Sequence, residues 1–181
     1  MAEDWDEAAS GGRLTLTFSQ RTPPPPGQDD KPPRVIPVAV GLIGPNGDEV
    51  QATRMLEMTE AQQSFSFDGL GARPVVSALR GFSAPVVLDR NIDDATRAFL
   101  LAHDTDPFAR WEAGRDLAMS ALISLSQGQA AGADYIDAIG RLAADDGADP
   151  AFRALCLMLP GDEEIATRLA ADGVTPDPDA I

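Results

Sequence analysis

The amino-acid sequence predicts an α+β fold in two domains, a β-sandwich followed by an α-helical segment. Apolar residues alternate with polar ones up to about residue 90, and they recur at helical spacing beyond it. Residues 1–90 hold 8 basic and 12 acidic residues and ten of the fifteen prolines, whereas residues 91–181 hold 6 basic and 17 acidic residues. Because composition and period change together, we expect a domain boundary between residues 90 and 91.

The first domain is expected to consist of short strands. Residues 14–18 and 63–67 alternate strictly between apolar and polar side chains, as half-buried strands do. The apolar run 35–43 precedes Asn46-Gly47, a pair that tolerates positive φ and predicts a hairpin turn. Such closely spaced strands are typical of an immunoglobulin-like β-sandwich. Other strand candidates are a return strand near Val50 and residues 54–58, 75–82 and 86–89.

Two segments of the first half do not read as strands. Prolines are dense in residues 21–33, and we expect an exposed loop of polyproline character there. The run Pro23–Pro26 could instead dock in an SH3-like groove, although a stiff loop is favoured. Residues 1–12 are acidic and are interpreted as a linker or an artificial start of the chain. The sandwich would then occupy residues 13–90.

Five helices are expected in residues 91–181. Asn91 would cap a helix over residues 92–103. Asp106-Pro107 and Asp149-Pro150 each place a capping residue before a proline at the first helical position, and these signals lie 43 residues apart. That distance is close to the period of stacked helical hairpins and suggests a superhelical segment, which we interpret as a truncated part of a larger helical domain.

The remaining helices follow from the same spacing. One contains residues 135–142, one runs from residue 150 to about 159, and one covers residues 162–171. The helix that begins at Pro107 should end before Gly128. Its expected buried face consists of Phe108, Trp111, Ala118, Met119, Leu122 and Leu125.

The composition excludes several classes of function. The net charge of −15 argues against a sequence-independent nucleic-acid binder, which needs a cationic face. No run of about eighteen apolar residues is present, so we expect no membrane-spanning segment. His103 is the only histidine and Cys156 the only cysteine. An HExxH zinc motif, a cysteine-rich zinc site and an internal disulfide therefore cannot be built within this sequence.

Two acidic clusters could be read as metal sites. His103, Asp104 and Asp106 offer one nitrogen and two carboxylates, but a helix end followed by a helix cap is the favoured interpretation. Asp145, Asp146 and Asp149 lack the alternating spacing and the distal glutamate of a calcium loop. A solvated connection between helices is the favoured interpretation of this second cluster.

Other reactive residues also have a structural interpretation that we prefer. Cys156 lies on an apolar helix face and is expected to be a buried thiol rather than a nucleophile. Glu163 and Glu164 are adjacent and point in different directions on a helix. Arg110 and Trp111 could form a recognition pair, but we expect Trp111 to pack between sandwich and helices and Arg110 to face solvent or an acidic partner. We therefore predict no catalytic, cofactor-binding or metal-binding residue.

Several strings, in order and at matching spacing, resemble bacterial aminopeptidase N, a family of zinc-dependent gluzincin peptidases. The segments that carry the resemblance are Ser19–Pro23, Ile36–Leu42, Gln63–Phe67, Pro74–Leu79, Phe82–Val86 and Leu100–Ala113. Together the likeness covers roughly residues 13–180. The first five segments resemble the family's β-sandwich domain, and the last resembles the opening of its C-terminal helical domain.

The resemblance implies a non-catalytic part of a longer enzyme that removes N-terminal amino acids from peptides. The zinc-binding HExxH motif and the GxMEN motif of this peptidase M1 family are absent, so no family catalytic residue is carried over. Zinc is expected in the parent protein only. The implied partners are the catalytic domain of the same polypeptide and peptide substrates, and the implied compartment is the cytoplasm. The alternative is a free-standing module that binds a peptide or protein. An independent hydrolase is disfavoured because no carboxylate pair stands out.

Overall fold

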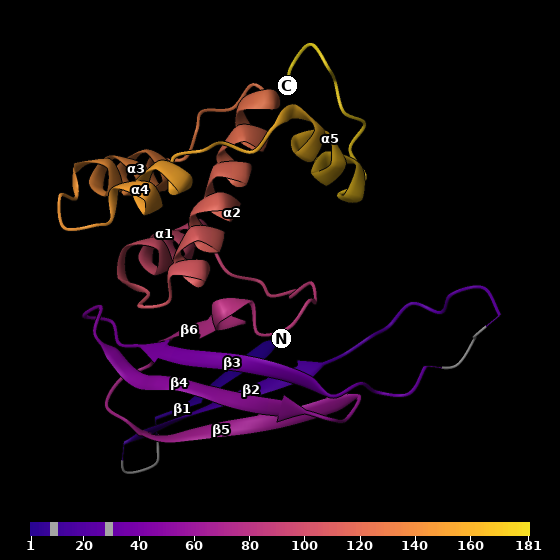
Figure 1. Ribbon diagram of the computed structural model, residues 1–181, viewed down its shortest axis with the longest axis vertical. Helices are drawn as coiled ribbons and strands as arrows, with labels where there is room; N and C mark the ends of the chain where they lie inside the picture. The colour runs from indigo at the N-terminus through magenta and orange to yellow at the C-terminus, as the bar shows by residue number, and fades with distance from the viewer. Residues whose placement is uncertain (8–10, 28–30) are drawn as a thin grey trace. The chain divides into compact units, whose positions relative to one another are not determined.

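The computed structural model describes residues 1–7, 11–27 and 31–181 and divides the chain into two units, Met1–Asn91 and Ile92–Ile181. The first unit contains strands and the second contains helices (Figure 1). The predicted α+β fold, a sandwich followed by helices, is confirmed. The division falls one residue beyond the expected boundary.

Two antiparallel three-stranded sheets form the first unit. One sheet has the order β1–β2–β5 and the other the order β4–β3–β6. Both sheets contribute to one hydrophobic core, which includes Leu16 of β2 and Val40 of β3. The strands are β1 (Ala2–Asp6), β2 (Gly12–Ser19), β3 (Ile36–Ile43), β4 (Glu49–Met58), β5 (Gln62–Leu70) and β6 (Val75–Ala78).

The alternation in β2 explains how it sits in its sheet. Leu14, Leu16 and Phe18 are buried in the core. The hydroxyls between them lie on the opposite face, where Thr17 hydrogen-bonds Ser64 of β5 at 2.8 Å. A one-residue change of register would bring these hydroxyls into the core, so the pattern fixes the pairing of β2 with β5.

Residues 2–6 form a strand, so the linker expected for residues 1–12 is wrong. β1 pairs with β2 from Ala2 opposite Thr17 to Asp6 opposite Arg13, and Trp5 packs against the sandwich core. The strand is short and acidic, and a single large apolar side chain does not define a period of two. Residues 8–10 of the expected linker and residues 28–30 of the expected proline-rich loop lie outside the described residues. The described parts of that loop, 21–27 and 31–33, contain no strand or helix.

The hairpin prediction is confirmed, but the last two strand predictions are not. Gly47 has a φ of 88° in the turn between β3 and β4. The strand expected over 75–82 ends at Ala78, because Leu79 has a φ of 57° and leaves the extended region. A 3₁₀ turn, Arg80–Phe82, follows it. Residues 86–89 form no strand, and Val87 is 98% exposed.

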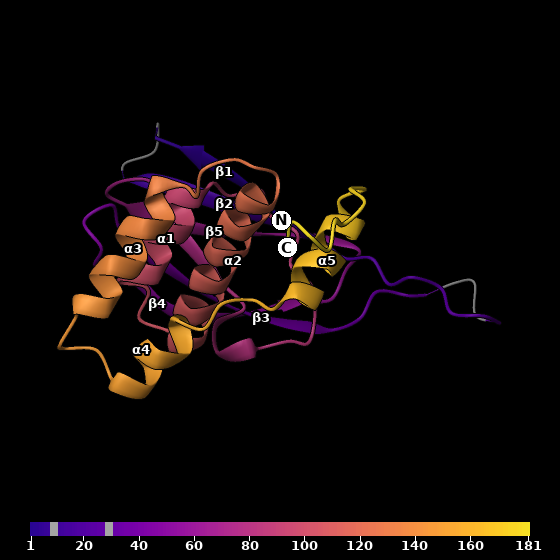
Figure 2. The same cartoon turned by 90° about the horizontal axis from the view of Figure 1, so that it is seen from above.

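Five helices form the second unit, as expected. They are α1 (Asp94–His103), α2 (Pro107–Ser126), α3 (Ala133–Ala144), α4 (Pro150–Cys156) and α5 (Asp162–Ala171). Figure 2 shows α1 beside both α2 and α3. The cap of α1 is Asp93, which accepts from the backbone N–H of Thr96 at 2.8 Å, and not Asn91. No helix among the described residues is long and apolar enough to cross a membrane.

Two further predictions about the helices are wrong. Helix α4 ends at Cys156 rather than near Leu159, and a turn closed by a 3.2 Å hydrogen bond from the backbone N–H of Met158 to the carbonyl of Leu155 follows it. The buried face of α2 is also rotated from the predicted one. Small side chains line it and let α1 approach closely, so that a Cβ on Gly114 would lie 3.1 Å from Leu101. The buried residues of α2 are Ala109, Ala113, Gly114, Leu117, Ala118 and Ala121.

Candidate functional site

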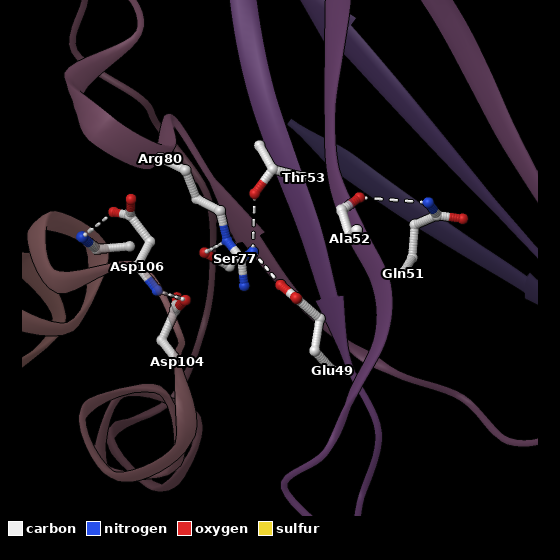
Figure 3. A network of polar contacts seen from close by, with 9 residues as sticks. Glu49, Gln51, Ala52, Thr53, Ser77, Arg80, Asp104 and Asp106 are labelled. Carbon is white, nitrogen blue, oxygen red and sulfur yellow. Dashed lines mark hydrogen bonds and ion pairs between the residues drawn. The ribbon is translucent and has the colours of Figure 1, made fainter.

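A buried arginine organises the polar contacts of the β4–β3–β6 sheet. Arg80 is 3% exposed, and its Nε donates to Ser77 Oγ at 2.9 Å (Figure 3). Its Nη1 donates to Thr53 Oγ1 at 3.0 Å and forms an ion pair with Glu49. Because these partners come from β4 and from the end of β6, the guanidinium group ties the two outer strands of the sheet together. The arrangement is structural and brings no nucleophile beside a base.

The backbone on either side of Arg80 is shaped to place it there. Leu79, Gly81 and Phe82 have φ angles of 57°, 61° and 54°, which only glycine adopts without strain. Gly41 of β3 leaves the space that the guanidinium group fills. Sequence reasoning missed Arg80, because no periodic pattern marks a charged residue that folds back over its own sheet.

The cluster of His103, Asp104 and Asp106 is a helix junction. Asp104 Oδ1 accepts from the backbone N–H of Asp106 at 2.9 Å, and Asp106 Oδ1 accepts from that of Ala109 at 2.8 Å (Figure 3). The His103 ring lies 4.7 Å, centre to centre, from the ring of Phe99. Within residues 1–7, 11–27 and 31–181, no three His, Cys, Asp or Glu residues could hold a metal ion. The favoured interpretation as a helix end and a cap is confirmed.

The second acidic cluster also serves the ends of helices. Asp145 Oδ1 accepts from the backbone N–H of Gly147 at 3.0 Å, and Asp149 Oδ1 accepts from that of Phe152 at 2.9 Å. Asp146 forms an ion pair with Arg153, in which Oδ1 lies 3.6 Å from Nη1. The three side chains therefore close the loop between α3 and α4 and begin α4.

We expect the Asp149→Ala variant to lower the free energy of unfolding of the helical unit by about 1 kcal/mol. The change leaves an N–H at the start of α4 without its side-chain acceptor. Urea unfolding followed by circular dichroism measures this loss. Asp149→Asn keeps an acceptor oxygen and serves as the control. Equal losses in the two variants would contradict a capping role.

Cys156 lies in the core of the helical unit, as expected. It packs in a cluster of buried residues with Leu101, Leu117 and Leu142. Burial raises the pKa of its thiol above the ordinary value, against a smaller lowering by the charge of Arg110. A raised pKa keeps the thiol protonated at neutral pH, which is the opposite of what a nucleophile needs.

Glu164 is held by specific partners. It accepts from the backbone N–H of Gly161 at 3.0 Å and forms an ion pair with Arg115 of α2. The hydrogen bond from Arg115 and the one from Gly161 lower the pKa of Glu164 below its usual value. The contact therefore joins α5 to α2.

The Arg115→Gln variant is expected to raise the pKa of Glu164 toward 4.5, the ordinary value, because it removes the larger cause of the lowering. A lowered folded-state pKa means that the ionised carboxylate stabilises the fold above its unfolded pKa, and that this contribution is lost as the pH falls through the folded value. Carboxyl-carbon NMR titration measures the change. Arg168→Gln, whose partner is Asp172, should leave the Glu164 titration unchanged.

The sequence predicts that Arg110 faces solvent or an acidic partner, whereas its side chain contacts a backbone carbonyl and an aromatic ring of the helical unit. Its Nε donates to the backbone carbonyl of Leu101 at 2.9 Å, and its guanidinium carbon lies 5.1 Å from the centre of the Phe152 ring. Trp111 packs against the core of its own unit. The guanidinium carbon of Arg115 lies 5.7 Å from the centre of the Trp111 ring. Each of the two side chains therefore has partners within the helical unit.

One cavity of the helical unit combines charged and apolar walls. Its volume is about 240 Å³, and it lies between α1, α2 and α3. The apolar part comes from α1 and α3, and the charged part includes two arginines. The lining residues are Leu101, Ala102, Arg110, Ala138, Arg141, Leu142 and Asp145. Sequence reasoning did not identify Arg141, because it is exposed, as an arginine on an amphipathic helix ordinarily is, and nothing in its spacing marks the cavity that it lines.

Comparison with known proteins relates both units to aminopeptidases. Aminopeptidase N of Caulobacter vibrioides is 42% identical over 136 residues, covering 74% of this chain and 16% of the relative. Aminopeptidase N of Escherichia coli is 36% identical over 168 residues, which cover 85% of this chain and 19% of that relative. The crystal structure of Legionella pneumophila aminopeptidase A in complex with aspartic acid has the same fold, with a TM-score of 0.77 at 22% identity over 98% of this chain and 20% of that one.

Models of protein families match both halves of the chain. Residues 94–181 match the family described as the DUF3458_C domain of unknown function, ARM repeats. Residues 1–91 match the family described as the DUF3458 domain of unknown function, Ig-like fold. The chain spans about a fifth of the length of the relatives it matches. Because the Ig-like match covers half of the sequence and the ARM-repeat match follows it directly, the chain belongs to the DUF3458 Ig-like family, and the resemblance to bacterial aminopeptidase N is confirmed.

Proposed function

We propose that this chain is the non-catalytic scaffold portion of a zinc-dependent aminopeptidase that removes N-terminal amino acids from peptides. The observation that carries the proposal is the similarity of both units, in order, to bacterial aminopeptidase N. In this proposal the sandwich positions the helical domain, and the helices wall the chamber above the active site. The partners are the catalytic domain of the same polypeptide and its peptide substrates, the compartment is the cytoplasm, and neither nucleic acid nor a membrane is involved.

The residues of this chain do not fit the zinc ion of such an enzyme. Structural and catalytic zinc sites need three or four nitrogen, sulfur or carboxylate ligands. The described residues contain no such group, and the candidate carboxylates Asp106 and Asp149 accept hydrogen bonds at the starts of helices. In the proposed enzyme, zinc is therefore held by residues outside this sequence.

The structure supports a mechanical contribution from each unit. In the sandwich, the core is shared by two sheets, and Arg80 joins β4 to the end of β6. In the helical unit, the Arg115–Glu164 pair joins α2 to α5. Contacts between elements that are distant in sequence resist deformation, which is what a domain that positions another domain requires.

A domain exchange tests the proposal. The matching segment of the Caulobacter vibrioides aminopeptidase N is replaced by this chain, and hydrolysis of an aminoacyl p-nitroanilide is measured. We expect the chimera to keep kcat/KM within about tenfold of the parent enzyme, and deletion of the segment to abolish activity. A folded chimera without activity would contradict the proposal. So would stoichiometric zinc together with amide hydrolysis in the isolated 181-residue chain.

A further inference from the structure

The arginines of the helical unit fall into two groups. Residues 92–181 contain six arginines and 17 acidic residues, all of them described. Four of the arginines pair with carboxylates, namely Arg97 with Asp94, Arg115 with Glu164, Arg153 with Asp146 and Arg168 with Asp172. Within the described part of the chain, Arg110 and Arg141 form no such pair, yet both line the same cavity. In so acidic a unit, two unpaired guanidinium groups at one place point to an anionic ligand.

The first of these guanidinium groups is held in place. The bond from Nε to the carbonyl of Leu101 and the ring of Phe152 fix the plane of the Arg110 side chain. Its Nη hydrogens have no protein acceptor among the described residues. A guanidinium fork of fixed orientation matches the two oxygens of a carboxylate, and it loses little conformational entropy when it binds one.

The remaining walls determine what the rest of the ligand is. Leu101, Ala102, Ala138 and Leu142 present an apolar surface beside the arginines. Asp145 is the one carboxylate in the lining, and its Oδ1 already accepts from the backbone of Gly147. We propose that this cavity binds a small aliphatic carboxylic acid, with the carboxylate at Arg110 and Arg141 and the hydrocarbon chain against the apolar wall. A volume of about 240 Å³ leaves room for a short-chain acid such as hexanoate. This site is separate from the proposed scaffold role.

Titration of the isotopically labelled 181-residue chain with hexanoate tests the proposal. We expect saturable NMR shifts of the Arg110 and Arg141 side-chain N–H groups, with a Kd of about 1 mM for a ligand of this size. Hexylammonium, which has the same tail and the opposite charge, should cause none. Absence of saturable shifts well above this concentration would overturn the proposal. Inorganic phosphate that binds as tightly as hexanoate would overturn the aliphatic assignment.

Matched variants locate the effect. Arg141→Gln should weaken hexanoate binding by about tenfold or more, because it removes a charged hydrogen-bond donor. Arg168→Gln removes the same charge outside the cavity and should leave the Kd unchanged. Ala102→Leu keeps both arginines and fills the cavity from an exposed position of α1, so it should also weaken binding. Unchanged affinity in a folded Arg141→Gln or Ala102→Leu variant would overturn the proposal.

Discussion

The Gly41→Ala variant is expected to lower the free energy of unfolding of the sandwich by about 3 kcal/mol. A Cβ atom at position 41 would lie 2.0 Å from Arg80 Cζ and 2.1 Å from its Nη1. The guanidinium group cannot simply move away, because it is buried and bonded to Ser77, Thr53 and Glu49. Its displacement would break these bonds and leave polar groups of the sheet without partners.

A double-mutant cycle separates this clash from an effect on the backbone. Gly41 has no positive φ, so alanine can adopt its conformation. In an Arg80→Ala background the obstructing atoms are gone, and Gly41→Ala should cost less than about 1 kcal/mol. Urea unfolding followed by Trp5 fluorescence, with Trp111 replaced by phenylalanine, reports on the sandwich because Trp5 packs against its core. An equal cost in both backgrounds would contradict the role assigned to Arg80.

The elements that could be predicted from the sequence are those with strong local signals. The Asp-Pro starts at residues 106 and 149 are correct, because a cap and a proline act within one turn of helix. The alternation of β2 and the Asn46-Gly47 turn are equally local. β1 could not be predicted, since its place depends on pairing with β2 rather than on its own pattern.

The polar features needed information that only the folded chain contains. Arg80 is buried because the backbone turns at Leu79 and because Gly41, distant in sequence, leaves room for it. The cavity brings together residues of three helices, and no sequence spacing relates Arg110 to Arg141. By contrast, the capping roles of Asp106 and Asp149 could be predicted from the sequence. Each carboxylate accepts a hydrogen bond from the backbone N–H only three residues further along the chain, so the contact is local.

The Leu117→Ala variant is expected to lower the free energy of unfolding of the helical unit by about 3 kcal/mol. Leu117 is 1% exposed and packs with Leu101 and Leu142. The other buried residues of this cluster, Ala98, Ala138 and Cys156, are small, and the larger side chains that pack against it are only partly buried. Removing one of the leucines leaves a cavity that the rigid packing of α1 on α2 cannot close. The matched control is Leu125→Ala on the same helix, where the side chain is 51% exposed.

The control variant distinguishes the two possible buried faces of α2. Both changes convert leucine to alanine within one helix, so the difference in helix propensity is the same in each. The sequence pattern places Leu125 in the core, whereas the structure buries Leu117. Urea unfolding followed by Trp111 fluorescence, with Trp5 replaced by phenylalanine, should give a change for Leu125→Ala within about 0.5 kcal/mol of zero. A larger loss for Leu125→Ala than for Leu117→Ala would mean that α2 is rotated about its axis, and the cavity beside Arg110 would then have different walls.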